Sequence, residues 1–218
     1  LVVAAHNLRT PLTAVHWAFE GLKKDLSIRP ESMELASTGL LATNQLLKIV
    51  DDLLAAAKLE EGKFGYEFFE GDLIGFLDHI CTEAQAIAAA YNVKVYFQAP
   101  SSPLPVMRFD PEKLGTAMAN LIDNAIKYNV SNGTVTIKAQ QLADSPYALI
   151  SVADTGVGIQ PEALKKLFTK FFRAENVVKF ATEGTGLGLY IARNIIQRHG
   201  GKIWVESPLN RGTTFYFT

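Results

Sequence analysis

The sequence predicts an α+β protein in two parts, an N-terminal helical hairpin followed by an α/β sandwich. Apolar residues recur at heptad spacing through the first part, up to about Leu59. A polar segment with two glycines then breaks this pattern at residues 60–65. Beyond it, helical and strand-like segments are mixed without strict β–α–β alternation, which favours an α+β sandwich over a doubly wound sheet.

The hairpin is expected from two amphipathic helices joined by a short turn. Pro30 separates them, because proline fits the first turn of a helix better than its interior. On the first helix the apolar side chains alternate at spacings of four and three, at Leu8, Leu12, Val15, Phe19, Leu22 and Leu26. The apolar face of the second helix comprises Leu40, Leu47, Val50, Leu54 and Ala57.

Heptad seams of this kind need a partner helix to cover them. A lone hairpin buries its seams poorly, whereas a four-helix bundle built from two chains buries them well. We therefore expect a homodimer. In the alternative, the hairpin packs on the rest of its own chain.

The second part is expected to alternate irregularly between helices and strands. Asp72 and Asp110 are the expected N-caps of its first two helices, with Pro111 at the first position of the second. We expect helices at residues 72–91, 111–128, 161–172 and 188–199, and strands at 93–97, 134–138, 148–152, 202–206 and 213–217. The predicted domain boundaries are 1–61 for the hairpin, 62–71 for a linker and 72–218 for the sandwich.

Composition excludes several classes of function. The formal net charge of −1 gives no global field toward nucleic acid or anionic lipid. The single cysteine, Cys81, allows no intrachain disulfide, and no apolar run approaches the ~20 residues of a membrane span. The chain opens on Leu1 without an initiator methionine, so we expect a cytoplasmic fragment of a longer protein, whose upstream segments would carry any membrane anchor.

The first candidate motif for ligand binding is Asp154-Thr155-Gly156-Val157-Gly158-Ile159, directly after a predicted strand. A carboxylate there can accept a hydrogen bond from an exocyclic amine, while the glycines let the backbone pass close to a flat ring. Asp-Xaa-Gly is also a common turn, so this motif alone indicates little.

The second motif, Gly184-Thr185-Gly186-Leu187-Gly188-Leu189, opens a predicted helix. Backbone amides at a helix start attract phosphate. The motif is not a P-loop, because no Gly-Lys-Ser/Thr follows, and its spacing differs from the dinucleotide fingerprint. A glycine-rich helix entry needed only for packing is the alternative.

The third motif places Asn120, Asn124 and Lys127 on one face of a predicted helix, with Tyr128 next to them. An amide oxygen is a suitable hard ligand for Mg²⁺, which also takes phosphate oxygens. A lysine one turn further along can neutralise phosphate charge. Asparagine is a poor helix former, so two asparagines on one helix face are less expected to be only solvent-exposed surface residues.

Together these motifs resemble the Bergerat-type ATP-binding domain of histidine kinases, gyrase, Hsp90 and MutL, over roughly residues 72–218. The resemblance implies ATP and Mg²⁺ as cofactors, Asn124 as the metal ligand and Asp154 as the reader of the adenine amine. It also implies that residues 167–173 anchor a lid over the nucleotide. The implied nucleotide-binding residues are Asn120, Asn124, Lys127, Tyr128, Asp154, Gly156, Gly158, Arg173, Gly184, Thr185, Gly186, Gly188 and Leu189.

Asn120 separates two branches of that superfamily. The hydrolytic members carry a glutamate there that activates water, and an amide cannot act as a general base near neutral pH. We therefore expect ATP binding without fast hydrolysis, which suits a kinase and argues against the alternative of a plain ATPase.

His6-Asn7-Leu8-Arg9-Thr10-Pro11-Leu12 resembles the H-box of histidine kinases, and residues 1–61 resemble their dimerisation and phosphotransfer domain. The resemblance implies that His6 accepts the phosphoryl group from ATP and passes it to an aspartate of a response regulator receiver domain. It further implies that Thr10 orients water for removing phosphate from that regulator. Transfer within one chain and transfer between chains both stay open.

Asn7 departs from the family pattern, which usually has a glutamate or aspartate at this position. The carbonyl of Asn7 can accept the second ring N–H of the histidine but carries no negative charge. General-base assistance is typically worth about 10²–10⁴-fold, so we expect slow autophosphorylation. In the alternative, the chain is a degenerate kinase that acts as an ATP-binding scaffold or mainly as a phosphatase.

Overall fold

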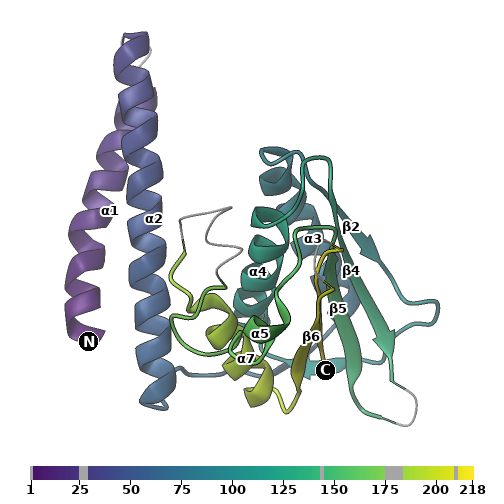
Figure 1. Ribbon diagram of the computed structural model, residues 1–218. Coiled ribbons are helices and arrows are strands. Elements are labelled where there is room, and N and C mark those ends of the chain that lie inside the picture. Colours follow the sequence, from purple (N-terminus) through teal and green to yellow (C-terminus); the bar gives the residue numbers. More distant parts are fainter. Residues whose placement is uncertain (1, 25–28, 143–144, 175–183, 209–210) are drawn as a thin grey trace. The chain divides into compact units, whose positions relative to one another are not determined.

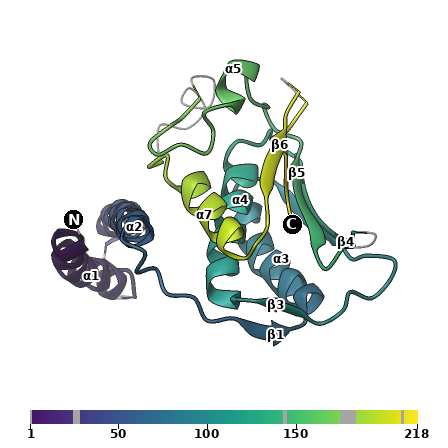
Figure 2. The ribbon, with the colours of Figure 1, turned by 90° about the horizontal axis from the view of Figure 1, so that it is seen from below.

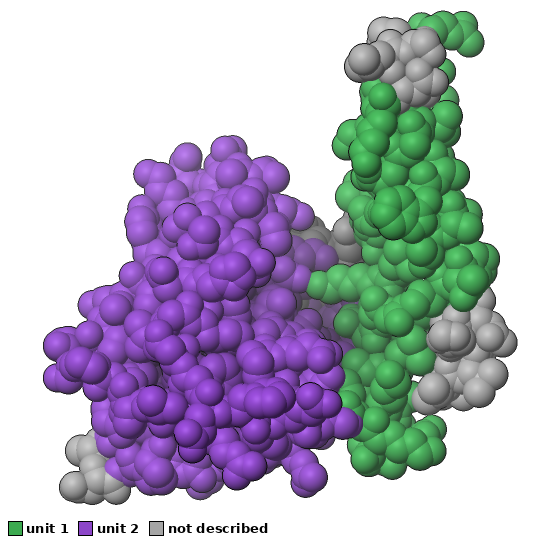
Figure 3. Space-filling model, turned by 180° about the vertical axis from the view of Figure 1, so that it is seen from behind, with its two compact units in different colours: residues 1–64 green, residues 65–218 purple. Residues whose placement is uncertain are grey.

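The computed structural model describes residues 2–24, 29–142, 145–174, 184–208 and 211–218, and the side chains of residues 2–7 and 30 are not among those described. The chain forms two compact units, residues 1–64 and 65–218, coloured separately in Figure 3. No helix of the described ranges combines the length and the apolar character needed to cross a bilayer.

The first unit is a hairpin of two helices, α1 (Val2–Lys24) and α2 (Pro30–Glu60), lying side by side in Figure 1. Pro30 occupies the first turn of α2 as expected, whereas Pro11 lies inside α1. Leu12 of α1 packs on the buried Val50 and Leu54 of α2. This contact confirms that the two expected apolar faces meet over part of their length.

Much of the α1 seam is nevertheless uncovered within one chain. Leu8, Val15 and Leu22 are 55%, 44% and 46% exposed, and Leu26 falls outside the described residues. On α2, Leu35 and Leu41 are exposed as well, at 72% and 60%. Single exposed apolar residues are normal, but a row of them along one hairpin indicates a surface that another molecule covers.

The described part of the second unit contains a five-stranded sheet in the order β2-β4-β5-β7-β6. Strand β2 runs parallel to β4, and the other neighbours are antiparallel. The strands are β2 (Lys94–Gln98), β4 (Thr134–Gln141), β5 (Ala148–Asp154), β6 (Ile203–Glu206) and β7 (Thr214–Phe217). Alternate residues of β4 and β5 are buried, which is the pattern of a sheet covered on one face.

Three helices cover that face, α3 (Leu73–Ala89), α4 (Pro111–Lys127) and α7 (Gly188–Arg198), as Figure 2 shows. Both predicted N-caps are confirmed: Asp72 accepts from the Ile74 N–H at 3.0 Å and Asp110 from the Lys113 N–H at 2.9 Å. The α/β sandwich expected from the sequence is therefore the fold observed.

A second, two-stranded sheet pairs β1 (Phe69–Gly71) with β3 (Met107–Phe109) in antiparallel register. Neither strand was predicted, because three residues are too few to display a period of two. β1 lies inside the range expected to be a linker, and it joins the polypeptide entering the second unit to the residues just before α4.

The helix expected over residues 161–172 is wrong in length. Only α5 (Pro161–Leu164) is helical, and turns follow it. The backbone reaches a left-handed conformation at Phe171, with φ of 61°, while the Phe168 ring packs edge-on against Phe215 at 6.3 Å. Aromatic and threonine residues are weak helix formers, and here packing against β7 prevails over the apolar spacing.

Candidate functional site

The first wall of the candidate site is α4, which presents Asn120, Asn124 and Lys127 at successive turns, as the spacing predicts. The Asn120 side chain is buried against the first residue of α7. A Cβ placed on Gly188 would come within 2.7 Å of Asn120 Oδ1. The asparagine motif of α4 and the glycine-rich motif before α7 are therefore neighbours in space.

The second wall is the turn that follows β5, where Asp154 is held by two backbone N–H groups. Its Oδ1 accepts from Gly156 at 2.7 Å and from Thr213 at 3.1 Å. Both bonds go to Oδ1, and no described residue donates a hydrogen bond to Oδ2. The turn thus provides a fixed carboxylate oxygen of the kind that reads an amine.

Burial raises the pKa of Asp154 to about 6, and the hydrogen bonds from Gly156 and Thr213 oppose this rise. The carboxyl group is accordingly ionised at pH 7 and becomes protonated just below pH 6. Perturbation of this kind is common at functional sites, where a polar group is kept in a partly dehydrated position.

The turn after β5 sits on the carboxyl end of α4. The Val157 N–H donates to the carbonyl oxygen of Tyr128 at 3.2 Å. A Cβ on Gly156 would collide with that same carbonyl oxygen. Gly156 is therefore required by close approach of two backbones, which places the Asp154 carboxylate beside the last turn of α4.

Positive charge gathers where the glycine-rich motif begins. A Cβ on Gly184 would lie 3.8 Å from Lys127 Nζ and 3.9 Å from the guanidinium carbon of Arg173. The two cations come from α4 and from the phenylalanine-rich segment, and Gly184 comes from the glycine-rich motif. Together with the first amides of α7, they form a place suited to phosphate oxygens.

The phenylalanine-rich segment contacts the glycine-rich motif through its backbone. A Cβ on Gly186 would lie 2.7 Å from the carbonyl carbon of Phe171, and the Leu187 N–H donates to Thr185 Oγ1 at 3.2 Å. The expected anchoring of the lid thus has a contact in the structure, although residues 175–183, the middle of the predicted lid, lie outside the described residues. Gly158 and Leu189, also predicted, lie in the β5 turn and in the first turn of α7.

The residues predicted for phosphotransfer belong to the other unit. His6 and Asn7 lie within α1, but their side chains are not among those described. Thr10 is exposed on the same helix, one turn after His6. The apolar seam of α1 runs past His6 at Leu8 and Leu12, so we expect the imidazole to face solvent, and this stays a prediction.

The other three histidines each contact a neighbouring residue within their own unit. His79 lies 3.5 Å from Glu83 on α3, and His16 packs edge-on against Trp17 at 5.7 Å. His199 accepts from the Asp110 N–H at 3.0 Å through Nε2, and its Nδ1 lies 2.8 Å from the Ile195 carbonyl oxygen. These contacts agree with assigning no phosphoacceptor role to them.

His199 and Asp110 also hold the segment that enters the second unit. Asp110 Oδ2 accepts from the Glu67 N–H at 2.7 Å. The Phe68 ring packs against the His199 ring at 4.9 Å, and the Tyr66 ring does so at 6.1 Å. Residues 66–71 are therefore part of the second unit rather than a free connection.

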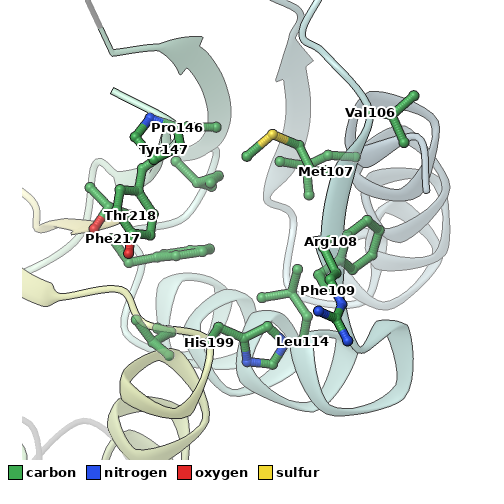
Figure 4. Close-up of a pocket in the computed structure, with 14 residues that line it drawn as sticks. Val106, Met107, Arg108, Phe109, Leu114, Pro146, Tyr147, His199, Phe217 and Thr218 are labelled. Carbon is green, nitrogen blue, oxygen red and sulfur yellow. The ribbon is translucent and has the colours of Figure 1, made fainter. Parts of the chain in front are cut away.

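An apolar cavity of about 230 Å³ lies elsewhere in the second unit, and Figure 4 shows its lining. Its walls include Met107, Phe109, Ala148, His199 and Phe217, and none of the predicted site residues lines it. Ile150 is the residue of β5 in the cavity lining that is nearest to Asp154, and it precedes Asp154 by four residues, which at the rise of a strand is roughly 13 Å. The cavity and the candidate site are separate.

Two residues that link the walls of the candidate site were not predicted from the sequence. Asn129 and Thr155 connect the end of α4 to the turn after β5 through a 3.0 Å hydrogen bond between their side chains. Their only signal in the sequence is position, directly after Tyr128 and directly after Asp154. Neither residue type at these positions distinguishes a link from an ordinary turn.

Comparison with known families gives two matches. Residues 109–218 match the model described as histidine kinase-, DNA gyrase B-, and HSP90-like ATPase. Residues 3–62 match the model of the His Kinase A (phospho-acceptor) domain. The two matches fall on the two units of the structure.

Relatives align with nearly the whole chain. The chain is 30% identical over 218 residues to the sensor histidine kinase WalK of Bacillus subtilis, covering 98% of this chain and 35% of WalK. It is 33% identical over 228 residues to the adaptive-response sensory kinase SasA of Synechocystis sp., covering 100% of this chain and 57% of SasA. The chain thus spans between about a third and somewhat more than half of these relatives.

Solved structures show the same architecture. Full-length ShkA in complex with AMPPNP superposes with a TM-score of 0.82 and 28% sequence identity, over 99% of this chain and 44% of that one. The Acinetobacter baumannii histidine kinase AdeS superposes with a TM-score of 0.66 over 97% of this chain and 95% of that one, at 22% identity. At that identity the second likeness concerns the fold alone.

Proposed function

The chain belongs to the two-component sensor histidine kinases, and on that basis we propose that it uses Mg-ATP to phosphorylate its own His6. His6 then passes the phosphoryl group to an aspartate on a response regulator. The proposal is supported by the position of the Asp154 carboxylate, whose turn contacts the end of α4 at Tyr128, and by Lys127 and Arg173, which lie beside Gly184 of the glycine-rich motif. In domain terms, we assign dimerisation and phosphotransfer to residues 1–61 and nucleotide binding to residues 72–218, while residues 66–71 of the expected linker 62–71 are held by the second unit.

In the proposed complex, the adenine amine donates to Oδ2 of Asp154, beside the close backbone contact at Gly156. The phosphates lie toward Lys127, Arg173 and the first amides of α7. Asn124, between Asn120 and Lys127 on the same face of α4, offers its amide oxygen to Mg²⁺. The ion would neutralise the β- and γ-phosphate charge, which is the main demand of phosphoryl transfer.

The acceptor step uses the lone pair of one imidazole nitrogen of His6. That nitrogen forms a bond to the γ-phosphorus as the bond from phosphorus to the bridging oxygen of ADP breaks. The amide oxygen of Asn7 accepts the N–H of the other ring nitrogen and so fixes the tautomer. A neutral imidazole is the major form at pH 7 for an exposed histidine with a pKa near ~6.5.

The uncovered apolar row on the hairpin supports a homodimer. Leu8, Val15 and Leu22 repeat at seven-residue intervals along α1, and each is more than two-fifths exposed. Pairing two hairpins into a four-helix bundle would cover this row. We place this kinase core in the cytoplasm, where ATP is available.

The direct test is incubation with Mg²⁺ and γ-labelled ATP, followed by exposure of the labelled protein to acid and to base. We expect label that is lost in acid and retained in base, the behaviour of a phosphohistidine. Retention of bound ATP without any label would instead support the scaffold alternative. Rapid steady-state release of inorganic phosphate would support the alternative that the chain is a plain ATPase.

Replacing Asn7 with glutamate is expected to raise the autophosphorylation rate at saturating ATP by about 10²-fold or more, because a carboxylate can take the charge that develops on the imidazole. Asn7→Gln is the matched control, since glutamine has the length of glutamate without its charge. Initial rates of labelling measure the effect. Equal rates for Asn7→Glu and the wild type would show that the missing charge does not limit the reaction.

Replacing Thr10 with alanine is expected to lower dephosphorylation of the response regulator by about ten-fold or more, while His6 still becomes labelled. The hydroxyl one turn after His6 is suited to orienting a water molecule, a contribution that proximity makes large. Release of phosphate from phosphorylated regulator measures it. Thr13→Ala is the control, because the Thr13 hydroxyl donates to the Arg9 carbonyl at 2.9 Å, and equal loss in both variants would contradict the assignment.

A further inference from the structure

Asn129, just past the end of α4, uses both groups of its side-chain amide in hydrogen bonds. Its Nδ2 donates to the Ala125 carbonyl at 3.0 Å and to the Thr134 carbonyl at 3.1 Å. Its Oδ1 accepts from the Val130 N–H at 2.9 Å and from Thr155 Oγ1 at 3.0 Å. The amide is therefore joined at once to the last turn of α4, to the start of β4 and to the turn after β5.

Thr155 completes the link on the side of the carboxylate. Its hydroxyl donates to Asn129 and accepts from the Thr134 N–H at 2.9 Å, and its own N–H donates to the Thr134 carbonyl at 3.1 Å. Thr155 stands between Asp154, which carries the amine-reading oxygen, and Gly156, which contacts α4. Any shift of Thr155 therefore moves the carboxylate.

Gly133 confirms how closely these segments approach. A Cβ at Gly133 would collide with Asn129 Oδ1 and would lie 2.8 Å from Thr155 Oγ1. Glycine is required here because the turn before β4 passes directly over the bond between the two side chains. The Asn129–Thr155 pair thus lies directly against the backbone of Gly133, with Asn129 half-buried and Thr155 exposed.

Building on the proposed function, we infer that Asn129 is a positioning residue for adenine recognition. It fixes the distance between Asp154, which reads the adenine amine, and α4, which carries the groups for metal and phosphate. Adenine and the triphosphate are covalently joined through the ribose, so the two halves of the site must lie at a separation that one nucleotide can span. Among the described residues, Asn129 and Thr155 provide a side-chain link between the Asp154 turn and α4. Recognition of the adenine 6-amino group depends on this link.

The test compares the affinity for ATP with that for purine riboside triphosphate, which lacks only the 6-amino group, in the presence of Mg²⁺. We expect the wild type to prefer ATP. In Asn129→Ala the affinity for ATP should fall by roughly ten-fold, the scale of one hydrogen bond to a charged group. The affinity for the analogue should stay nearly unchanged, so that the preference disappears.

Thr155→Val is the second variant, because it removes only the hydroxyl that joins Asn129. If the residues act as one unit, the double variant should show the same loss of preference as either single variant. Asn194→Ala controls for loss of a local asparagine bond, since Asn194 Nδ2 donates to the Tyr190 carbonyl at 2.8 Å on α7. It should keep the preference for ATP.

The outcomes separate this inference from the proposed function. A wild type with no preference for ATP would overturn adenine reading by Asp154 and with it both proposals. A wild type that prefers ATP and an Asn129→Ala variant that prefers it equally would overturn only the role of Asn129. Equal losses for both nucleotides would also overturn it, by showing general damage, and if Asn129→Ala does not fold, Thr155→Val decides by the same criterion.

Discussion

Replacing His6 with glutamine is expected to reduce incorporation of the γ-phosphoryl group to background while ATP still binds. Glutamine keeps a polar side chain of similar size but has no basic nitrogen lone pair, so it cannot attack phosphorus. The nucleotide site lies in the other compact unit, residues 65–218, and keeps all of its own groups. Loss of label together with wild-type ATP affinity is therefore the expected pair of results.

His16→Gln is the matched control, because His16 lies on the same helix and its ring packs against Trp17. It should label at the rate of the wild type. Acid-labile label that persisted on His6→Gln would assign the acceptor to another residue. Label lost from both variants would indicate damage to the hairpin instead of removal of the nucleophile.

Replacing Asp154 with asparagine is expected to weaken ATP binding on the order of 10²-fold. The asparagine oxygen can still accept from the Gly156 and Thr213 N–H groups, so the turn is retained. The new NH₂ group then faces the adenine amine, and two donors meet where a charge-assisted hydrogen bond existed. Titration calorimetry at pH 7.5 measures the loss, and an affinity within a factor of about three of the wild type would contradict the assignment.

The pH dependence provides an independent check on Asp154. Burial raises its pKa to about 6, so the carboxylate gains a proton as the pH falls through that value and loses acceptor strength. ATP affinity of the wild type should decline between pH 7 and pH 5, and the decline should be much smaller in Asp154→Asn. A common decline in both proteins would assign the titration to another group.

Stability responds to the same proton with the opposite sign. Between the ordinary value of 3.8 and about 6, the folded protein holds more protons on Asp154 than the unfolded chain does. The contribution of this residue to the free energy of unfolding therefore falls as the pH rises through that window. Above pH 6 the ionised carboxylate therefore favours ligand binding but lowers the free energy of unfolding.

The features predicted correctly from the sequence are those that depend on a few neighbouring residues, such as helix caps and short motifs. The N-caps at Asp72 and Asp110 are confirmed because one side chain and one nearby N–H determine a cap. The family was predicted from three short nucleotide-site motifs and the H-box at His6, and the family comparisons confirm it and do not favour the scaffold alternative. Chemistry that needs particular residue types at particular spacings leaves a mark in the sequence.

Long-range packing decided the rest. The expected helix at residues 161–172 shrank to α5 because Phe168 packs on β7, which is distant in sequence. Strands β1 and β3 exist only because they pair with each other, Phe69 with Phe109 and Gly71 with Met107, although they are far apart in the sequence. Asn129 and Thr155 are 26 residues apart, and nothing local shows that they meet.

The contacts that hold residues 66–71 in the second unit determine the length of the connection between the two units. Helix α2 ends at Glu60, and the chain is held again from Tyr66 and Glu67 onward by His199 and Asp110. Between these anchors the N–H groups of Gly62 and Lys63 donate to carbonyl oxygens of the last turn of α2, and Gly62 and Gly65 have left-handed backbone. Even with those bonds broken and residues 61–65 fully extended, the connection spans roughly 18 Å. Under the proposed function, this length limits how far ATP bound by the second unit can lie from the end of α2, and inserting a few residues here would raise that limit.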